Sequence, residues 1–148
     1  MNFDIVFAIK KHRCIIRKYL DALSEIAEWN CENQSGEIDE LLSDKFILLA
    51  TSKKRFYGVL TFDYYAPNEI HSLYIVPSQR RKGIGKALVE RAIEIVRGYD
   101  CFDEIVVTTM EIFHAKKFYK KCGFKLINTY PCYGRPAYDF KFNLTSTE

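Results

Sequence analysis

A short basic turn that contains two glycines is the part of the sequence best suited to chemistry. It reads Arg80-Arg81-Lys82-Gly83-Ile84-Gly85-Lys86, and it joins a strand that ends near Pro77 to a helix that begins at once. A helix start offers an anion free backbone N–H groups and the positive end of the helix dipole. Glycine lets the backbone approach a ligand closely and adopt a positive φ. The turn therefore predicts a pyrophosphate site.

Two other glycine-rich phosphate motifs fit this turn badly. A P-loop requires G-x-x-x-x-G-K-[ST], and a dinucleotide fingerprint requires G-x-G-x-x-G. Leu88 stands where that fingerprint has its third glycine. The simpler alternative is a tight strand-to-helix turn whose charges are only solvated.

Two segments together resemble the signatures of one enzyme family. Arg80-x-x-Gly83-x-Gly85, after the strand Leu73-Tyr74-Ile75-Val76-Pro77, resembles the acyl-CoA-binding signature of the GNAT superfamily of N-acetyltransferases. The later segment 113–124, FHAKKFYKKCGF, is similar to that family's second signature, A-x-x-F-Y-x-x-x-G-F. One helix and one strand are expected between them, as in the family, and the element order covers the whole chain. The resemblance implies an N-acetyltransferase that uses acetyl-CoA as co-substrate and needs no metal.

The resemblance also implies which residues hold acetyl-CoA. The pantetheine arm is expected between two splayed strands, where it pairs with the backbone of Leu73, Tyr74 and Ile75. The pyrophosphate is expected on the amides of Arg80, Arg81, Lys82, Gly83, Ile84, Gly85 and Lys86. Ile112 departs from the pattern, because many members have an asparagine there that helps to hold the cofactor arm.

Three residues are candidates for the proton transfers of acetylation. A lysine-like amine has a pKa near 10.4, so only about one molecule in a thousand is neutral near pH 7.4, and a general base helps. Strand alternation predicts that Glu69, His71, Leu73 and Ile75 share one face. Glu69 matches the position of the base in the histone-acetyltransferase branch, and His71, which titrates near neutrality, competes for this role. Tyr119 lies on the inward face of a helix and matches the family's F-Y position. A phenol can donate its proton to the leaving thiolate.

The elements that must position these residues follow from hydrophobic spacing and turn residues. Strands are expected at 3–9, 46–50, 57–62, 69–76, 104–109, 124–129 and 137–144, and helices at 12–29, 38–42, 84–96 and 114–122. The chain of 148 residues suits one domain, 1–148. Its two β-α-β crossovers favour an α/β (α+β) three-layer domain around one mixed sheet. The resemblance implies that this sheet is mostly antiparallel, is splayed at the acyl-CoA site and carries helices on both faces.

Acidic and basic residues are separated along the chain. Residues 19–44 contain eight acidic residues and no lysine or arginine, so the rest of the chain is strongly basic. Such a separation indicates two surfaces with partners of opposite charge. We expect a cationic primary amine as the acceptor, in a small molecule or a protein. A lysine, a polyamine, an aminoglycoside and a protein N-terminus all stay open, as does a non-catalytic acyl-CoA-binding module.

Other partners have less support in the sequence. No nucleic acid is expected, because the basic residues concentrate where the coenzyme phosphates would lie and no recognition helix is evident. No stretch approaches the roughly 18 apolar residues of a membrane span. The five cysteines are widely spaced and lack a C-x-x-C pair, which favours reduced thiols in a cytoplasmic protein over a zinc site or disulfides. The oligomeric state is open, with a homodimer among the options.

Overall fold

The computed structural model describes residues 2–18, 47–53, 55–63, 65–111 and 114–145. Residues 13–18 are helical, which confirms the beginning of the helix expected at 12–29. The rest of that helix, the helix expected at 38–42, the acidic segment 19–44 and Ile112 lie outside the described residues.

A seven-stranded sheet forms the centre of the structure, in the order β1-β2-β3-β4-β5-β7-β6. Its strands are β1 (Asp4–Phe7), β2 (Ile47–Ser52), β3 (Arg55–Phe62), β4 (Glu69–Ile75), β5 (Glu104–Met110), β6 (Lys125–Cys132) and β7 (Arg135–Asn143). Only β4 and β5 are parallel neighbours, while the other five pairs are antiparallel. The expected mixed, mostly antiparallel sheet is thus confirmed.

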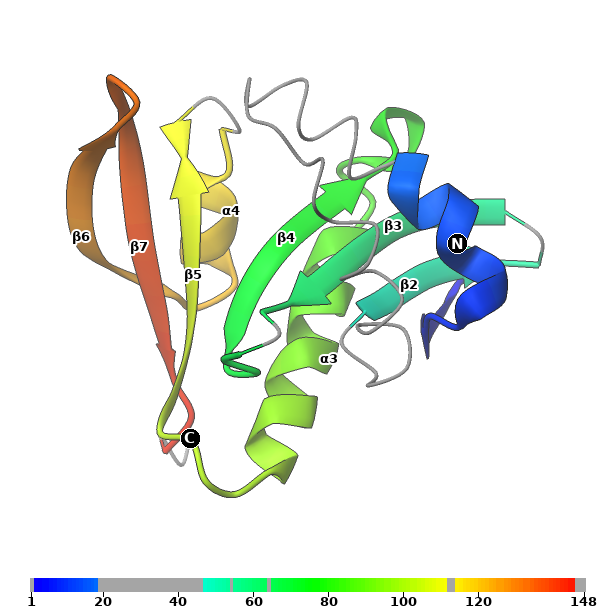
Figure 1. Ribbon diagram of the computed structural model, residues 1–148, viewed down its shortest axis with the longest axis horizontal. Helices are drawn as coiled ribbons and strands as arrows, with labels where there is room; N and C mark the ends of the chain where they lie inside the picture. Colours follow the sequence, from blue (N-terminus) through cyan, green and yellow to red (C-terminus); the bar gives the residue numbers. More distant parts are fainter. Residues whose placement is uncertain (1, 19–46, 54, 64, 112–113, 146–148) are drawn as a thin grey trace.

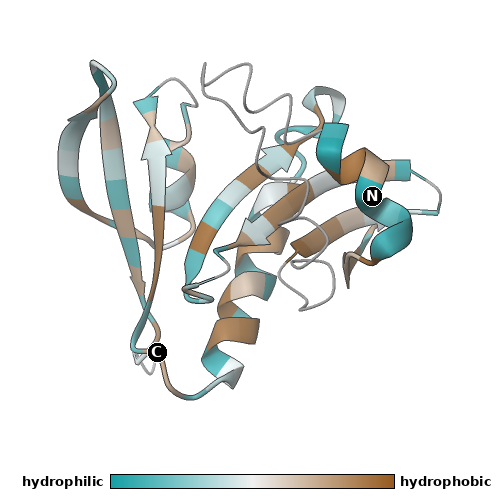
Figure 2. Ribbon diagram, viewed as in Figure 1, coloured by the Kyte–Doolittle hydropathy of each residue, from teal (hydrophilic) through white to brown (hydrophobic). Residues whose placement is uncertain are grey.

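Helices pack on both faces of this sheet, as expected for three layers. On one face lie α3 (Ile84–Gly98) and α4 (Lys116–Lys121), and Figure 2 shows hydrophobic residues recurring along α3 between hydrophilic ones. The hydrophobic ones form an apolar stripe on this helix. The buried residues of that stripe recur at helical spacing: Ile84, Leu88, Val89, Ala92, Ile93 and Val96. On the other face, Ile16 of the helical segment 13–18 packs with Ile47, Leu49 and Val59. Two short 3-10 turns, Lys10–His12 and Pro77–Gln79, precede helices.

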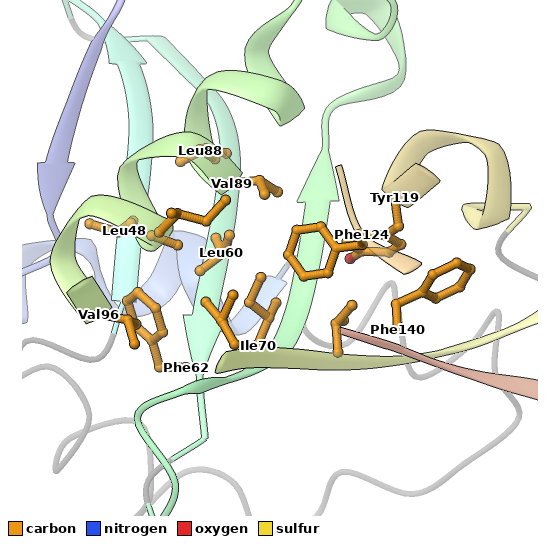
Figure 3. Close-up of a cluster of buried hydrophobic side chains, with 14 of the residues drawn as sticks. Leu48, Leu60, Phe62, Ile70, Leu88, Val89, Val96, Tyr119, Phe124 and Phe140 are labelled. Carbon is orange, nitrogen blue, oxygen red and sulfur yellow. The ribbon is translucent and has the colours of Figure 1, made fainter. Parts of the chain in front are cut away.

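The larger core joins α3 and α4 to the central strands. Leu60, Ile70, Leu88 and Phe140 are all at most 1% exposed and belong to one continuous cluster, part of which Figure 3 shows. Truncating such a side chain to alanine costs about 2–5 kcal/mol of stability. This packing therefore sets where the start of α3 and the inward face of α4 lie relative to β4.

Candidate active site

The strands β4 and β5 pair over only two residues and then separate. Glu69 pairs with Val106 and Ile70 with Val107, although β4 continues to Ile75 and β5 to Met110. The separation of the two strands toward their C-terminal ends is visible in Figure 1. Backbone N–H and C=O groups along this part of β4 therefore face β5 without a strand partner, and they can bind an extended ligand instead. The expected splay in the sheet is confirmed.

A β-bulge lies in β4 where this separation begins. Thr61 of β3 opposes Ser72, but the next residue, Phe62, opposes Ile70, so His71 is an extra residue in β4. A bulge kinks its strand and re-aims the side chains that follow it. The hydroxyls of Thr61 and Ser72 bond to each other at 2.5 Å across the two strands.

The bulge changes which side chains of β4 share a face. Leu73 and Ile75 pack against the same core cluster as Ile70, on the α3 face of the sheet, whereas Tyr74 packs on the opposite face. The expectation that Glu69, His71, Leu73 and Ile75 share one face is therefore wrong. Strict alternation fails because the extra residue shifts the pleat by one position.

The start of α3 has the geometry that the glycines predict. Gly83 is the N-cap with φ +84°, it has no side chain to cap the helix, and a Cβ added there would meet no heavy atom within 4 Å. The amides of the first turn of an α-helix lack intrahelical acceptors, so they are available to an anion. Gly85 serves a different purpose, since a Cβ there would lie 3.2 Å from the Phe118 ring of α4 and 3.7 Å from Ile75. Two glycines thus meet two separate requirements.

The cations of this turn do not all act in the same way. Arg80 turns back, because its Nε donates to the carbonyl oxygen of Ile75 at 2.9 Å and its guanidinium lies 5.5 Å from the centre of the Tyr74 ring. Lys86 faces Glu90 at 3.8 Å, one helical turn later. Four cationic side chains at this end of α3 are exposed: Arg80, Arg81, Lys82 and Lys86. The turn thus combines a fixed backbone with a positive surface.

Tyr119 is almost completely buried in α4, at 3% exposure. Its ring centroid lies 5.1 Å from that of Phe118, 5.7 Å from Phe124 and 5.8 Å from Phe140, and Figure 3 shows the last two contacts. Burial, with a smaller contribution from Cys122, raises the pKa of the Tyr119 phenol above its ordinary value. No hydrogen bond engages its hydroxyl within the described part of the chain. The group is therefore a protonated donor with no protein acceptor among those residues.

Glu69 and His71 lie near each other at the other end of β4, close to Asp63. The Oδ2 atom of Asp63 lies 3.9 Å from Nδ1 of His71. The pKa of Glu69 is raised mainly by partial burial and then by the charge of Asp63, with a further contribution from Asp139, while His71 lowers it. A carboxylate with a raised pKa holds a proton more readily, and perturbed carboxylates of this kind are frequent in active sites.

A group around Asp139 was missed by reasoning from the sequence. Oδ1 of Asp139 accepts from the Thr108 hydroxyl at 2.7 Å and from the Tyr130 hydroxyl at 3.3 Å, and Asn128 donates to Oδ2 at 3.4 Å. These residues belong to β5, β6 and β7, which become neighbours only in the sheet. The one signal in the sequence, an acid between two aromatic residues of a strand, fits any solvated strand face.

Two further features concern metals and membranes. Within the described residues, no three or more histidine, cysteine, aspartate or glutamate side chains come together in a way that could hold a metal ion. In the same part of the chain, no helix has the length and apolar character required to cross a membrane.

The family model that matches this chain is the acetyltransferase (GNAT) family, over residues 16–124. A curated relative, the chloroplastic GCN5-related N-acetyltransferase 3 of Arabidopsis thaliana, is 32% identical over 68 residues. The match covers 46% of this chain and 27% of that protein. The chain therefore spans about a quarter of the length of this relative.

Solved structures show the same fold at low sequence identity. Ard1 from Thermoplasma volcanium superposes with a TM-score of 0.79 and 19% identity, covering 99% of this chain and 100% of that one. YncA from Salmonella typhimurium, solved with its cofactor acetyl-CoA, superposes with a TM-score of 0.77 and 16% identity, covering 100% of this chain and 97% of that one. NAA60 from Arabidopsis thaliana, solved with a bisubstrate analogue, superposes with a TM-score of 0.76 and 14% identity, covering 96% of this chain and 98% of that one.

A mixed sheet that opens beside a glycine-bearing helix start matches the fold of these acetyltransferase structures. The family model spans well over half of the sequence, and the chain belongs to the acetyltransferase (GNAT) family.

Proposed function

We propose that this protein transfers the acetyl group of acetyl-CoA directly to a primary amine. The observation that carries the proposal is the separation of β4 from β5 after Ile70, directly beside the start of α3. This arrangement combines free strand backbone for an extended pantetheine arm with free helix amides for a pyrophosphate. The two features fit the two parts of a single coenzyme.

The donor would lie along β4 and end at α3. The backbone of Leu73, Tyr74 and Ile75 would pair with the amide groups of the pantetheine arm. The amides at 80–86 would hold the pyrophosphate, with the exposed cations of the turn adding favourable charge. The hydrogen bond from Arg80 to Ile75 supports this geometry, because it ties the end of β4 to the turn that follows.

The acceptor would approach from the face of the sheet opposite α3. Glu69, Asp63 and Asp139 make this face negative, which would attract an alkylammonium ion and disfavour an anionic acceptor. The lack of lysine and arginine at 19–44 agrees with the same preference. A cationic amine is therefore the acceptor class that we propose.

Acetyl transfer then needs the nitrogen to lose two protons and the leaving sulfur to gain one. The ammonium ion loses a proton to Glu69 or His71, and the neutral nitrogen attacks the thioester carbonyl carbon. Backbone N–H groups on the open part of β4 would stabilise the oxyanion. The C–S bond breaks as Tyr119 gives its proton to the departing thiolate. The attacking nitrogen loses its second proton as the neutral amide forms, and a proton returned through water restores the Tyr119 phenol. The raised pKa of Tyr119 keeps this proton in place until negative charge develops on sulfur.

An amine panel tests the proposal. The full chain is incubated with acetyl-CoA and, separately, with a lysine peptide, a peptide with a free N-terminus, spermidine and an aminoglycoside, while release of free coenzyme thiol is followed. We expect thiol release that depends on one of these amines, and succinate serves as an anionic control without an amine. Stabilisation by acetyl-CoA with no amine-dependent thiol release would instead support a non-catalytic acyl-CoA-binding module.

A further inference from the structure

His71 occupies the position in β4 where the sheet opens. Ile70 is the last residue of β4 that pairs with β5, and His71 is the extra residue of the bulge that follows it. Glu69 lies two residues earlier, still beside Val106 of β5. A strand rises about 3.3 Å per residue, so His71 lies about 7 Å further along β4 toward the proposed pantetheine site. It is therefore nearer than Glu69 to the expected thioester.

Asp63 is held rigidly next to His71. Its backbone N–H donates to the carbonyl oxygen of Glu69 at 2.9 Å, which fixes the end of β3 against the start of β4. Its Oδ1 atom accepts from the N–H of Tyr65 at 2.9 Å and from the N–H of Ala66 at 3.2 Å. These two bonds orient the carboxylate and leave Oδ2 at 3.9 Å from Nδ1 of His71, an ion-pair distance that is longer than a hydrogen bond. A small rotation of the exposed imidazole would bring an Nδ1–H group within hydrogen-bond range of Oδ2.

We propose that Asp63 is a positioning residue that keeps the neutral His71 ring protonated on Nδ1, so that Nε2 can take the proton of the acceptor amine. The proposal rests on the proposed acetyl transfer and assigns its base. The proton moves from the amine nitrogen to Nε2, and the resulting imidazolium is stabilised by the Asp63 carboxylate through the Nδ1–H group. A carboxylate that fixes the tautomer of a catalytic imidazole acts in the same way in hydrolytic triads.

The hydrogen bonds of Asp63 make Asp63→Asn a sharp test. Two backbone N–H groups require an oxygen at the Oδ1 position, so the asparagine must keep its oxygen there. Its NH₂ group then faces Nδ1 of His71 and can only donate to it. A His71 ring that hydrogen-bonds this NH₂ group accepts at Nδ1 and carries its proton on Nε2, which is the wrong tautomer for a base at that atom. The turn itself is preserved, so we expect the variant to fold.

The tautomer is measured by ¹⁵N NMR of the histidine rings in the full chain, in mildly alkaline buffer. The sequence has three histidines, and the spectrum of His71→Gln identifies the signals of His71. His12 provides an internal reference for the opposite tautomer, because its Nδ1 accepts from the N–H of Ile9 at 3.0 Å. We expect the neutral His71 ring to carry its proton on Nδ1 in the parent protein and on Nε2 in Asp63→Asn. An Nε2–H ring in the parent, or the same tautomer in both proteins, would overturn the proposal.

Kinetics with the best amine of the panel complete the test. Asp63→Asn should lower kcat about ten- to a hundredfold, as loss of an orienting partner does elsewhere, with the KM for acetyl-CoA unchanged. The losses of Asp63→Asn and His71→Gln should not add in the double variant, and fully additive losses would contradict the pair. The exposed Asp103→Asn is the matched control and should change neither tautomer nor rate. If the parent protein has the Nδ1–H tautomer but transfers no acetyl group, the proposed function is wrong. If the parent protein is active but its His71 carries the proton on Nε2, only the proposed pairing of Asp63 with His71 is wrong.

Discussion

The Nε atom of Arg80 donates a 2.9 Å hydrogen bond to the carbonyl oxygen of Ile75, across the turn that joins β4 to α3. The last residue of β4 is thereby tied to the loop that would hold the pyrophosphate. The same guanidinium lies over the Tyr74 ring, so one side chain makes two contacts with the end of β4. The side chain of Arg80 thus orders the turn, whose backbone amides belong to the proposed pyrophosphate site.

Replacing Arg80 by methionine should therefore weaken the binding of acetyl-CoA. The loop loses its link to β4 and must be ordered when the coenzyme binds, which we expect to raise the Kd about fivefold to tenfold. Isothermal titration calorimetry measures the change. Arg97→Met, which removes an exposed cation at the other end of α3, is the control for charge alone. Equal losses in the two variants would show that Arg80 acts only through its charge.

The double variant Gly83→Val/Gly85→Val should lose its response to acetyl-CoA. A valine at 83 must adopt a positive φ, and one at 85 meets the Phe118 ring, so the amides at the start of α3 should be displaced. We expect the parent to gain several degrees in melting temperature with saturating acetyl-CoA and the variant to gain none.

The control for the glycine experiment is Gly98→Ala at the end of α3. No heavy atom lies within 4 Å of a Cβ at this position, and its φ is not in the left-handed region. This variant should respond to acetyl-CoA like the parent. A normal thermal response of the Gly83/Gly85 double variant would mean that the coenzyme binds elsewhere.

Tyr119→Phe should lower kcat without unfolding the protein. The change removes one oxygen that has no hydrogen-bond partner among the described residues and keeps the ring contacts. Loss of a general acid costs about 10²–10⁴-fold in rate. The binding of acetyl-CoA should change far less, because the proton is needed only as charge develops on sulfur.

An acetyl donor with a more acidic thiol sharpens this test. Such a thiol leaves without a proton, so it should restore much of the rate of Tyr119→Phe and change the parent little. Tyr99→Phe, at an exposed tyrosine beyond α3, controls for loss of a phenol elsewhere. Full activity of a folded Tyr119→Phe variant would return Tyr119 to a purely structural role.

Glu69→Gln should stabilise the protein relative to the parent at neutral pH, and this gain should disappear at acidic pH. The folded state raises the pKa of Glu69, so it binds this proton more tightly than the unfolded chain does. The stability of the parent therefore falls as the pH rises from the ordinary glutamate range through the raised pKa, and glutamine abolishes this loss. The Glu69 side chain is only partly buried and solvent screens its charge, so we expect a gain of at most about 2 °C in melting temperature.

The kinetics of Glu69→Gln separate the two candidate bases. With His71 as the base, Glu69 acts on the charge of the acceptor, and the variant should raise the KM for the amine severalfold with a smaller effect on kcat. This rise should shrink at high ionic strength, because salt screens the interaction of exposed charges. A large loss of kcat that recovers at high pH, where neutral amine is abundant, would identify Glu69 as the base instead.

Local sequence determined much of the fold and the conformation of the turn at 80–86. The apolar stripe of α3 follows from helical spacing alone, and Gly83 marks the start of this helix because few other residues adopt a positive φ there. The ends of the seven strands were likewise predicted to within three residues. α4 is shorter than expected at its start, since His114 has φ +51° and lies outside the helix. These features depend on the conformational preferences of neighbouring residues, which the sequence carries directly.

Tertiary structure alone decided the surroundings of Glu69 and His71. The bulge at His71 arises from the pairing of β4 with β3, and it overrides the alternation that the sequence predicts. Asp63 reaches His71 only because the loop between β3 and β4 folds back, and Asp139 gathers partners from two other strands. Even the need for glycine at 85 comes from Phe118, which lies 33 positions later in the chain. These contacts join residues that are distant in sequence, and their geometry follows from the register of the strands and the packing of the core.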